Sequence, residues 1–98
     1  MNTSLIDKLQ NYFVSTPVAK AWVFGSFARN EEDEDSDLDL LIDFNAGHKI
    51  TLFGYAHLVN EIQKLTHKKV DLVENGHLRS YAQKSAEQDK ILIYERKD

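Results

Sequence analysis

The chain has 98 residues, the length of one small domain, and its 42% apolar and 29% charged residues are ordinary for a globular protein. Its net charge of -4 argues against non-specific nucleic-acid binding, and the absence of cysteine excludes disulfide scaffolds and thiolate metal sites. No apolar run reaches the roughly 18 residues that span a bilayer, and the N-terminus does not resemble a secretory signal. We therefore expect one cytoplasmic domain over residues 1–98, without membrane contact.

The first half of the chain predicts one helix and two strands. Apolar residues at helical spacing predict an amphipathic helix over residues 4–14. Residues 19–25 are typical of a short buried strand, in which Trp22 and Phe24 are expected to belong to the core. A second strand is predicted over residues 37–44, before a turn rich in asparagine and glycine.

The second half predicts a longer helix, a third strand and two further elements. Helical periodicity extends over residues 50–65, and an apolar strand pattern follows at 68–74. Residues 77–89 favour another helix, while 90–95 fit either a last strand or the end of a helix. This order predicts an α/β or α+β fold, in which helices flank one or both faces of a small mixed sheet of three or four strands.

Two acids interrupt the second strand. Because successive side chains of a strand point to opposite faces, Asp37 and Asp39 are expected side by side, with Leu38 and Leu40 directed into the core. Carboxylates this close repel each other unless a cation lies between them. The pattern therefore favours a Mg²⁺ site over a strand built only for stability.

A third acid, Asp71, interrupts the apolar strand at residues 68–74. If that strand lies beside residues 37–44, its carboxylate reaches the same face as Asp37 and Asp39. Three such acids suit a two-metal site, in which one ion holds phosphates and the other activates an attacking oxygen. We therefore expect these three aspartates to ligate two Mg²⁺ ions.

A Gly-Ser pair, Gly25 and Ser26, marks the change from the first strand to a helical turn. Such a turn directs backbone N–H groups and a hydroxyl at an anion, although the pair alone is a weak signal. Arg29 is the leading basic candidate for a phosphate contact, with a surface ion pair as an equal alternative. Weaker candidates are Arg79, Lys84 and Lys90. The acidic run at residues 31–35 is expected to be a solvated loop, and Asp43 a solvated residue at a strand end.

These motifs resemble the signature of the minimal nucleotidyltransferases, the smallest members of the DNA polymerase beta superfamily. The family pattern is Gly-Ser-X-Ala-Arg-Gly, five residues, then Ser-Asp-X-Asp-Leu. Here it is matched at Gly25, Ser26, Ala28, Arg29, Ser36, Asp37, Asp39 and Leu40. A departure occurs at Asn30, where the family has glycine, but asparagine tolerates left-handed backbone geometry better than most residues. The resemblance covers nearly the whole chain.

The resemblance implies a nucleotidyltransferase fold and an enzyme that transfers a nucleoside monophosphate, usually AMP from ATP, to a hydroxyl with release of pyrophosphate. Gly25 and Ser26 would hold the triphosphate. Asp37 and Asp39 would be catalytic metal ligands, and Asp71 would complete the second metal site and help to deprotonate the acceptor. Catalysis would then consist of positioning and charge neutralisation.

The resemblance also implies a partner, because a chain this short has no second domain to complete the nucleotide pocket. Minimal nucleotidyltransferases typically act as antitoxins that adenylylate a tyrosine of a HEPN ribonuclease toxin. The leading interpretation is therefore a protein adenylyltransferase antitoxin in a heteromeric complex, with a homodimer also open. The alternatives are an antitoxin that acts by binding alone, and a nucleotidyltransferase that modifies a small-molecule or RNA hydroxyl.

Overall fold

The computed structural model describes residues 3–25, 27–28, 37–47, 49–74 and 90–97. In these segments the chain forms two helices and four strands. Their bounds are α1 (Thr3–Phe13), β1 (Val18–Phe24), β2 (Leu38–Phe44), α2 (Leu52–Thr66), β3 (Val70–Glu74) and β4 (Ile91–Glu95). The predicted helix over residues 77–89 lies outside the described residues.

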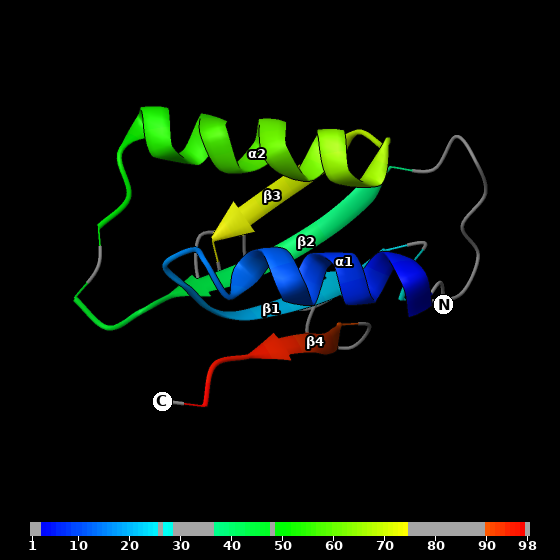
Figure 1. Cartoon of the computed structure of the whole chain (residues 1–98), viewed down its shortest axis with the longest axis horizontal. Coiled ribbons are helices and arrows are strands. Elements are labelled where there is room, and N and C mark those ends of the chain that lie inside the picture. The colour runs from blue at the N-terminus through cyan, green and yellow to red at the C-terminus, as the bar shows by residue number, and fades with distance from the viewer. Residues whose placement is uncertain (1–2, 26, 29–36, 48, 75–89, 98) are drawn as a thin grey trace.

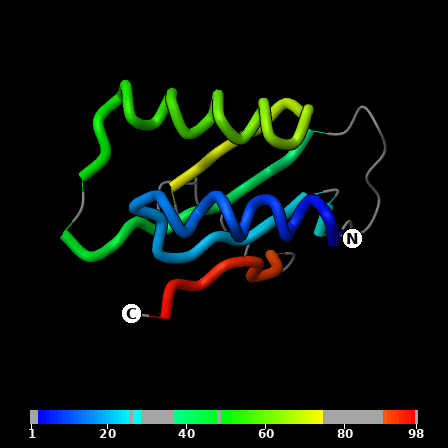
Figure 2. The backbone as a smooth tube through the Cα atoms, in the orientation of Figure 1, coloured from blue at the N-terminus to red at the C-terminus, as the bar shows by residue number. Residues whose placement is uncertain are grey.

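The four strands form one mixed sheet in the order β3-β2-β1-β4 (Figure 1). β1 is antiparallel to both of its neighbours, whereas β2 and β3 are parallel. Figure 2 shows how the parallel pair arises: the chain leaves β2, passes through α2 and returns as β3 beside β2. The prediction of a small mixed sheet flanked by helices is confirmed.

The ambiguity at residues 90–95 is resolved by pairing with β1. β4 lies antiparallel to β1, with Lys20 opposite Glu95 and Ala21 opposite Tyr94. Lys20 and Glu95 also form an ion pair of 3.2 Å across the two strands. The segment is therefore a strand because a long-range partner is available, which periodicity alone does not reveal.

The core lies between one face of the sheet and the two helices, which are on the same side of it (Figure 1). Its buried side chains alternate along the strands and repeat with helical spacing in α1 and α2. They are Leu5, Leu9, Phe13, Val18, Ala21, Val23, Phe27, Leu38, Leu40, Ile42, Leu58, Ile62, Leu72 and Ile93. The expectation that Trp22 and Phe24 belong to this core is wrong: both are half-buried, and strand alternation directs them to the opposite face.

α2 has defined caps at both ends. The hydroxyl of Thr51 accepts a hydrogen bond of 3.0 Å from the backbone N–H of Gly54, and His67 adopts a left-handed conformation with φ 58°. The N–H of His67 donates to the carbonyl of Gln63 at 2.8 Å. Neither α1 nor α2 is long and apolar enough to cross a lipid bilayer.

Candidate active site

The condition that β3 lies beside β2 is met, and this pairing brings two of the three aspartates together. Asp39 and Asp71 are register partners in the parallel pair, and Phe24 is opposite Asp39 in the antiparallel pair. Neighbouring strands lie about 4.8 Å apart. Asp71, Asp39 and Phe24 therefore form one row across three strands, as required for the two carboxylates to share a ligand.

Both carboxylates lie on the face of the sheet that is turned away from the helices. Leu38 and Leu40, on either side of Asp39, are fully buried in the core, and Leu72 is 3% exposed. Asp39 is half-buried and Asp71 is exposed. The alternation predicted from the sequence thus holds, and it leaves this acidic pair accessible from the sheet face opposite the core.

Asp37 lies just ahead of β2 and not within it. The strand begins at Leu38, whose N–H donates to the carbonyl of Lys69 at 2.8 Å and which pairs with Val70. Asp37 is exposed. The predicted strand boundary at residue 37 is therefore one residue too early, because pairing with β3 starts only at Leu38.

Gly25 connects the end of β1 to the acidic row. Its φ is +71°, a conformation that favours glycine. A Cβ built on Gly25 would overlap Oδ2 of Asp39 and would lie 3.3 Å from its Cγ. The absence of a side chain at Gly25 thus lets the Asp39 carboxylate lie directly against the turn. Ser26 and Arg29, the other predicted nucleotide-binding residues, lie outside the described residues.

Tyr55 is a residue of this region that the sequence did not single out. From α2, its hydroxyl donates to the carbonyl of Leu72 on the outer edge of β3. Burial raises the pKa of the Tyr55 phenol above 10.0, and the negative charge of Asp71 raises it further. Tyr55 shares the helical spacing of the apolar residues in 50–65, and a tyrosine at such a position is the sign in the sequence that its hydroxyl has a partner.

A groove of about 560 Å³ runs along β3 from Asp71 to Glu74 and is closed on its other side by residues 50–52 and Tyr55. Within the described segments, no three side chains of histidine, aspartate or glutamate are grouped closely enough to hold a metal ion. The paired carboxylates of Asp39 and Asp71 are nevertheless the hard oxygen donors that Mg²⁺ takes, and such a site commonly uses one or two carboxylates with substrate phosphates.

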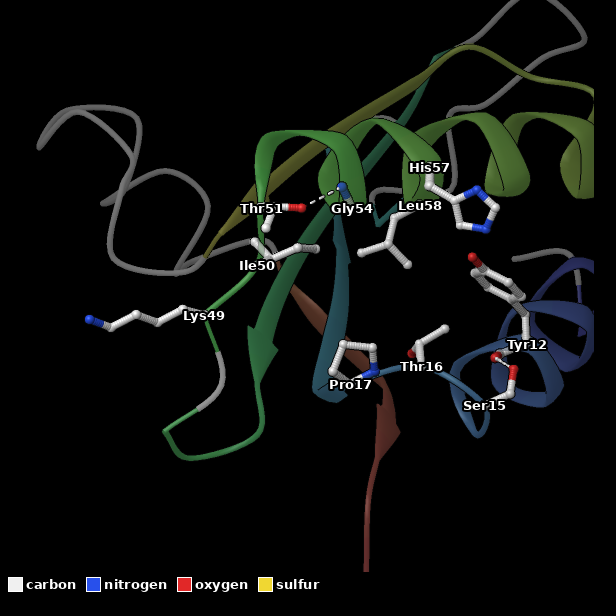
Figure 3. Close-up of a pocket in the computed structure, with 10 residues that line it drawn as sticks. All are labelled: Tyr12, Ser15, Thr16, Pro17, Lys49, Ile50, Thr51, Gly54, His57 and Leu58. Carbon is white, nitrogen blue, oxygen red and sulfur yellow. Dashed lines mark hydrogen bonds between the residues drawn. The ribbon is translucent and has the colours of Figure 1, made fainter.

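A second hollow, of about 410 Å³, lies between the end of α1 and the start of α2 (Figure 3). Tyr12 of α1 and His57 of α2 face each other across it. Burial raises the pKa of Tyr12 above 10.0, with a further contribution from Glu61. None of the predicted site residues that the structure describes lines this hollow, so it is separate from the acidic row.

Three comparisons relate the chain to known proteins. A family model described as "Nucleotidyltransferase domain" matches residues 4–93. "Putative protein adenylyltransferase MJ0126" of Methanocaldococcus jannaschii is 42% identical over 72 residues, which are 72% of this chain and 71% of that protein. "Protein adenylyltransferase MntA" of Thermococcus cleftensis is 33% identical over 76 residues, which are 78% and 75% of the two chains.

Solved structures share the same fold. A structure described as a "putative minimal nucleotidyltransferase" is 30% identical, with a TM-score of 0.73 over 91% of this chain and 89% of its own. A "toxin-antitoxin with AMP-PNP" has a TM-score of 0.73 at 15% identity and covers 99% and 76% of the two chains. The "toxin-antitoxin MntA-HepT" has a TM-score of 0.72 at 11% identity, with coverage of 97% and 74%.

Proposed function

The chain belongs to the nucleotidyltransferase domain family, and we propose that it is a Mg²⁺-dependent protein adenylyltransferase that acts as the antitoxin of a HEPN toxin. In this proposal AMP is transferred from ATP to a tyrosine hydroxyl of the toxin, which is thereby neutralised. The names of the related adenylyltransferases and the toxin-antitoxin structures with the same fold support this assignment. The observation that carries it is the register pairing of Asp39 with Asp71, with Asp39 lying against Gly25.

Two groups of predicted site residues have separate roles in the proposed reaction. Gly25 and Ser26 would bind the triphosphate through the turn, since backbone N–H groups and a hydroxyl there suit an anion. Asp37, Asp39 and Asp71 would hold two Mg²⁺ ions, which supply neutralisation of phosphate charge. For Asp37 to bind a metal ion, its carboxylate, which lies just ahead of β2, must approach the carboxylates of Asp39 and Asp71.

The chemical step exchanges the phosphoanhydride bond between the α- and β-phosphates of ATP for an ester bond between the α-phosphate and the tyrosine. The tyrosine oxygen of the partner bonds to the α-phosphorus of ATP, while the bond from that phosphorus to the β-bridging oxygen breaks and pyrophosphate leaves. Asp71, the exposed member of the pair, accepts the proton from the tyrosine hydroxyl. The chain mainly orients the two reactants and neutralises charge, as phosphoryl transfer generally requires.

The test incubates the chain with the product of the neighbouring gene, which the proposal expects to be a HEPN toxin. After incubation with ATP and Mg²⁺, intact mass spectrometry should find the partner heavier by one or more AMP groups, with a tyrosine as the modified residue. Asp39→Asn should abolish this gain. Asp43→Asn is the matched control, because Asp43 lies on the same strand and is paired with Lys20 at the far end of β1.

A different outcome would favour a different mechanism. If the partner were bound and inhibited without any gain of mass, the enzymatic proposal would be wrong, and neutralisation by binding alone would replace it. If a small molecule or an RNA end gained the nucleotide and the partner did not, the protein acceptor would be wrong.

A further inference from the structure

A lysine lies at the opposite end of the row from the paired aspartates. Lys90 directly precedes β4, and its Nζ is 4.6 Å from the centre of the Trp22 ring. β4 pairs with β1 so that Leu92 is opposite Trp22 and Ile91 is opposite Val23. One further step of this antiparallel register places Lys90 at the level of Phe24.

The ammonium of Lys90 is on the same face as the carboxylates. Ala21 and Val23, which flank Trp22 along β1, are buried in the core beneath the helices, at 0% and 1% exposure. Trp22 therefore points to the other face, which is the face of Asp39 and Asp71. A cation held over the Trp22 ring lies on that face as well.

The row thus has opposite charges at its two ends, and Gly25, where the predicted phosphate-binding turn begins, lies between them. At one level of the sheet the strands present Asp71, Asp39, Phe24 and Lys90, and Gly25 follows Phe24 directly. Lys90 is two strands from Asp39, on the order of 10 Å between backbones. A bound polyphosphate is a chain of negative groups, so it needs positive charge along its length. The proposed Mg²⁺ ions would supply that charge at the carboxylate end, and the ammonium of Lys90 can supply it at the other end.

We propose that Lys90 is a further nucleotide-binding residue, whose ammonium moves from the Trp22 ring to the β- and γ-phosphates of ATP. This inference rests on the proposed adenylyltransferase function and assigns a residue to the outer part of its triphosphate site. Lys90 stays protonated throughout. It offsets the negative charge that grows on the pyrophosphate as the bond to the α-phosphorus breaks, and it neither gives nor takes a proton.

The test compares the affinities for ATP and AMP, because only ATP carries the phosphates that Lys90 would bind. In titration calorimetry with Mg²⁺, Lys90→Ala should raise the Kd for ATP roughly 10-fold, as expected for one lost charge-assisted hydrogen bond. The Kd for AMP should change less than about 2-fold. Lys90→Arg should keep most of the affinity for ATP, since it preserves the charge.

Lys20→Ala provides the matched control. Lys20 is on β1 at the far end from Gly25, where it pairs with Glu95 at 3.2 Å. The Lys20→Ala substitution should leave the Kd for ATP unchanged. Trp22 is the single tryptophan of the chain, so its fluorescence gives an independent readout: ATP should alter the emission of the wild type as the ammonium leaves the ring, and AMP should not.

The outcomes separate this inference from the proposed function. If Lys90→Ala binds ATP as the wild type does, or loses affinity for ATP and AMP equally, the assignment of Lys90 is overturned while AMP transfer by the wild type still stands. If ATP leaves the Trp22 emission unchanged, the movement of the ammonium is overturned. A wild type that neither binds ATP nor transfers AMP would overturn both proposals.

Discussion

Gly25 carries two separate constraints, and both can be measured. Its positive φ disfavours any side chain, and a Cβ would also overlap the Asp39 carboxylate. We expect Gly25→Ala to lower the free energy of unfolding by about 2 to 4 kcal/mol, of which about 1 to 2 kcal/mol comes from the backbone conformation. Urea denaturation measures the total.

Gly47 supplies the comparison for the backbone part of this cost. Its φ is +79°, yet a Cβ there would meet nothing within 4 Å. Gly47→Ala should therefore cost only about 1 to 2 kcal/mol. Equal losses for Gly25→Ala and Gly47→Ala would mean that the Asp39 carboxylate moves away from the turn freely, contrary to the close packing proposed for the site.

At the level of single elements, Tyr55 links α2 to the outer edge of β3. Tyr55→Phe removes the hydrogen bond to the Leu72 carbonyl and should lower the free energy of unfolding by about 1 kcal/mol at neutral pH. The pKa of Tyr55 is raised above 10.0 by burial and by Asp71, so above pH 10 the unfolded chain releases this proton first. Stability then falls as the pH rises.

The raised pKa of Tyr55 also determines how the effect of Tyr55→Phe on the free energy of unfolding changes at alkaline pH. The stability contributed by the neutral phenol is fully present below its unfolded pKa of 10.0 and is lost as the pH rises through the folded value. Urea denaturation from about pH 8 to about pH 11 should therefore show the difference between wild type and Tyr55→Phe shrinking above pH 10. A constant difference over this range would contradict the raised pKa.

Arg96 is the corresponding link between the end of β4 and the end of α1. α1 has no basic residue in its last turn, and the guanidinium Nη2 of Arg96 donates to the carbonyls of Phe13 at 3.3 Å and Thr16 at 2.6 Å. Arg96→Ala should lower the free energy of unfolding by about 2 kcal/mol, because carbonyls at the helix end lose a charged donor. Lys97→Ala, an exposed neighbour, should change it by less than about 0.5 kcal/mol. Equal effects of the two substitutions in urea denaturation would rule out this role of Arg96.

At the scale of the whole molecule, α1 and α2 cover one face of the sheet in the described part of the chain, and the acidic row lies on the other face. A nucleotide bound there would stabilise the folded chain by mass action, by about 2.7 kcal/mol at 100 times its Kd. For a chain of this length we expect ATP with Mg²⁺ to raise the Tm on the order of 10 °C. Calorimetric melting should show this shift for the wild type and for Asp43→Asn, and its loss for Asp39→Asn. An undiminished shift for Asp39→Asn would place the nucleotide elsewhere.

The sequence by itself determined the two described helices and the two faces of β2. Helical spacing predicted α1 and α2, and alternation placed Leu38 and Leu40 in the core with Asp39 on the other face. These features are local, because a period of 2.0 or 3.6 residues can be read along the chain. The roles of Ser26 and Arg29 remain predictions from the motif, since both residues lie outside the described segments.

Only the tertiary structure decided which distant residues meet. The register that pairs Asp39 with Asp71 depends on the crossover through α2, and the strand at residues 90–95 depends on its pairing with β1. An apolar run does not reveal which face of a sheet the helices cover, so Trp22 was wrongly predicted to belong to the core. Contacts made through long-range pairing leave no period in the sequence, and for that reason only the assembled sheet shows the Tyr55 hydrogen bond to Leu72 and the position of Lys90 over the Trp22 ring.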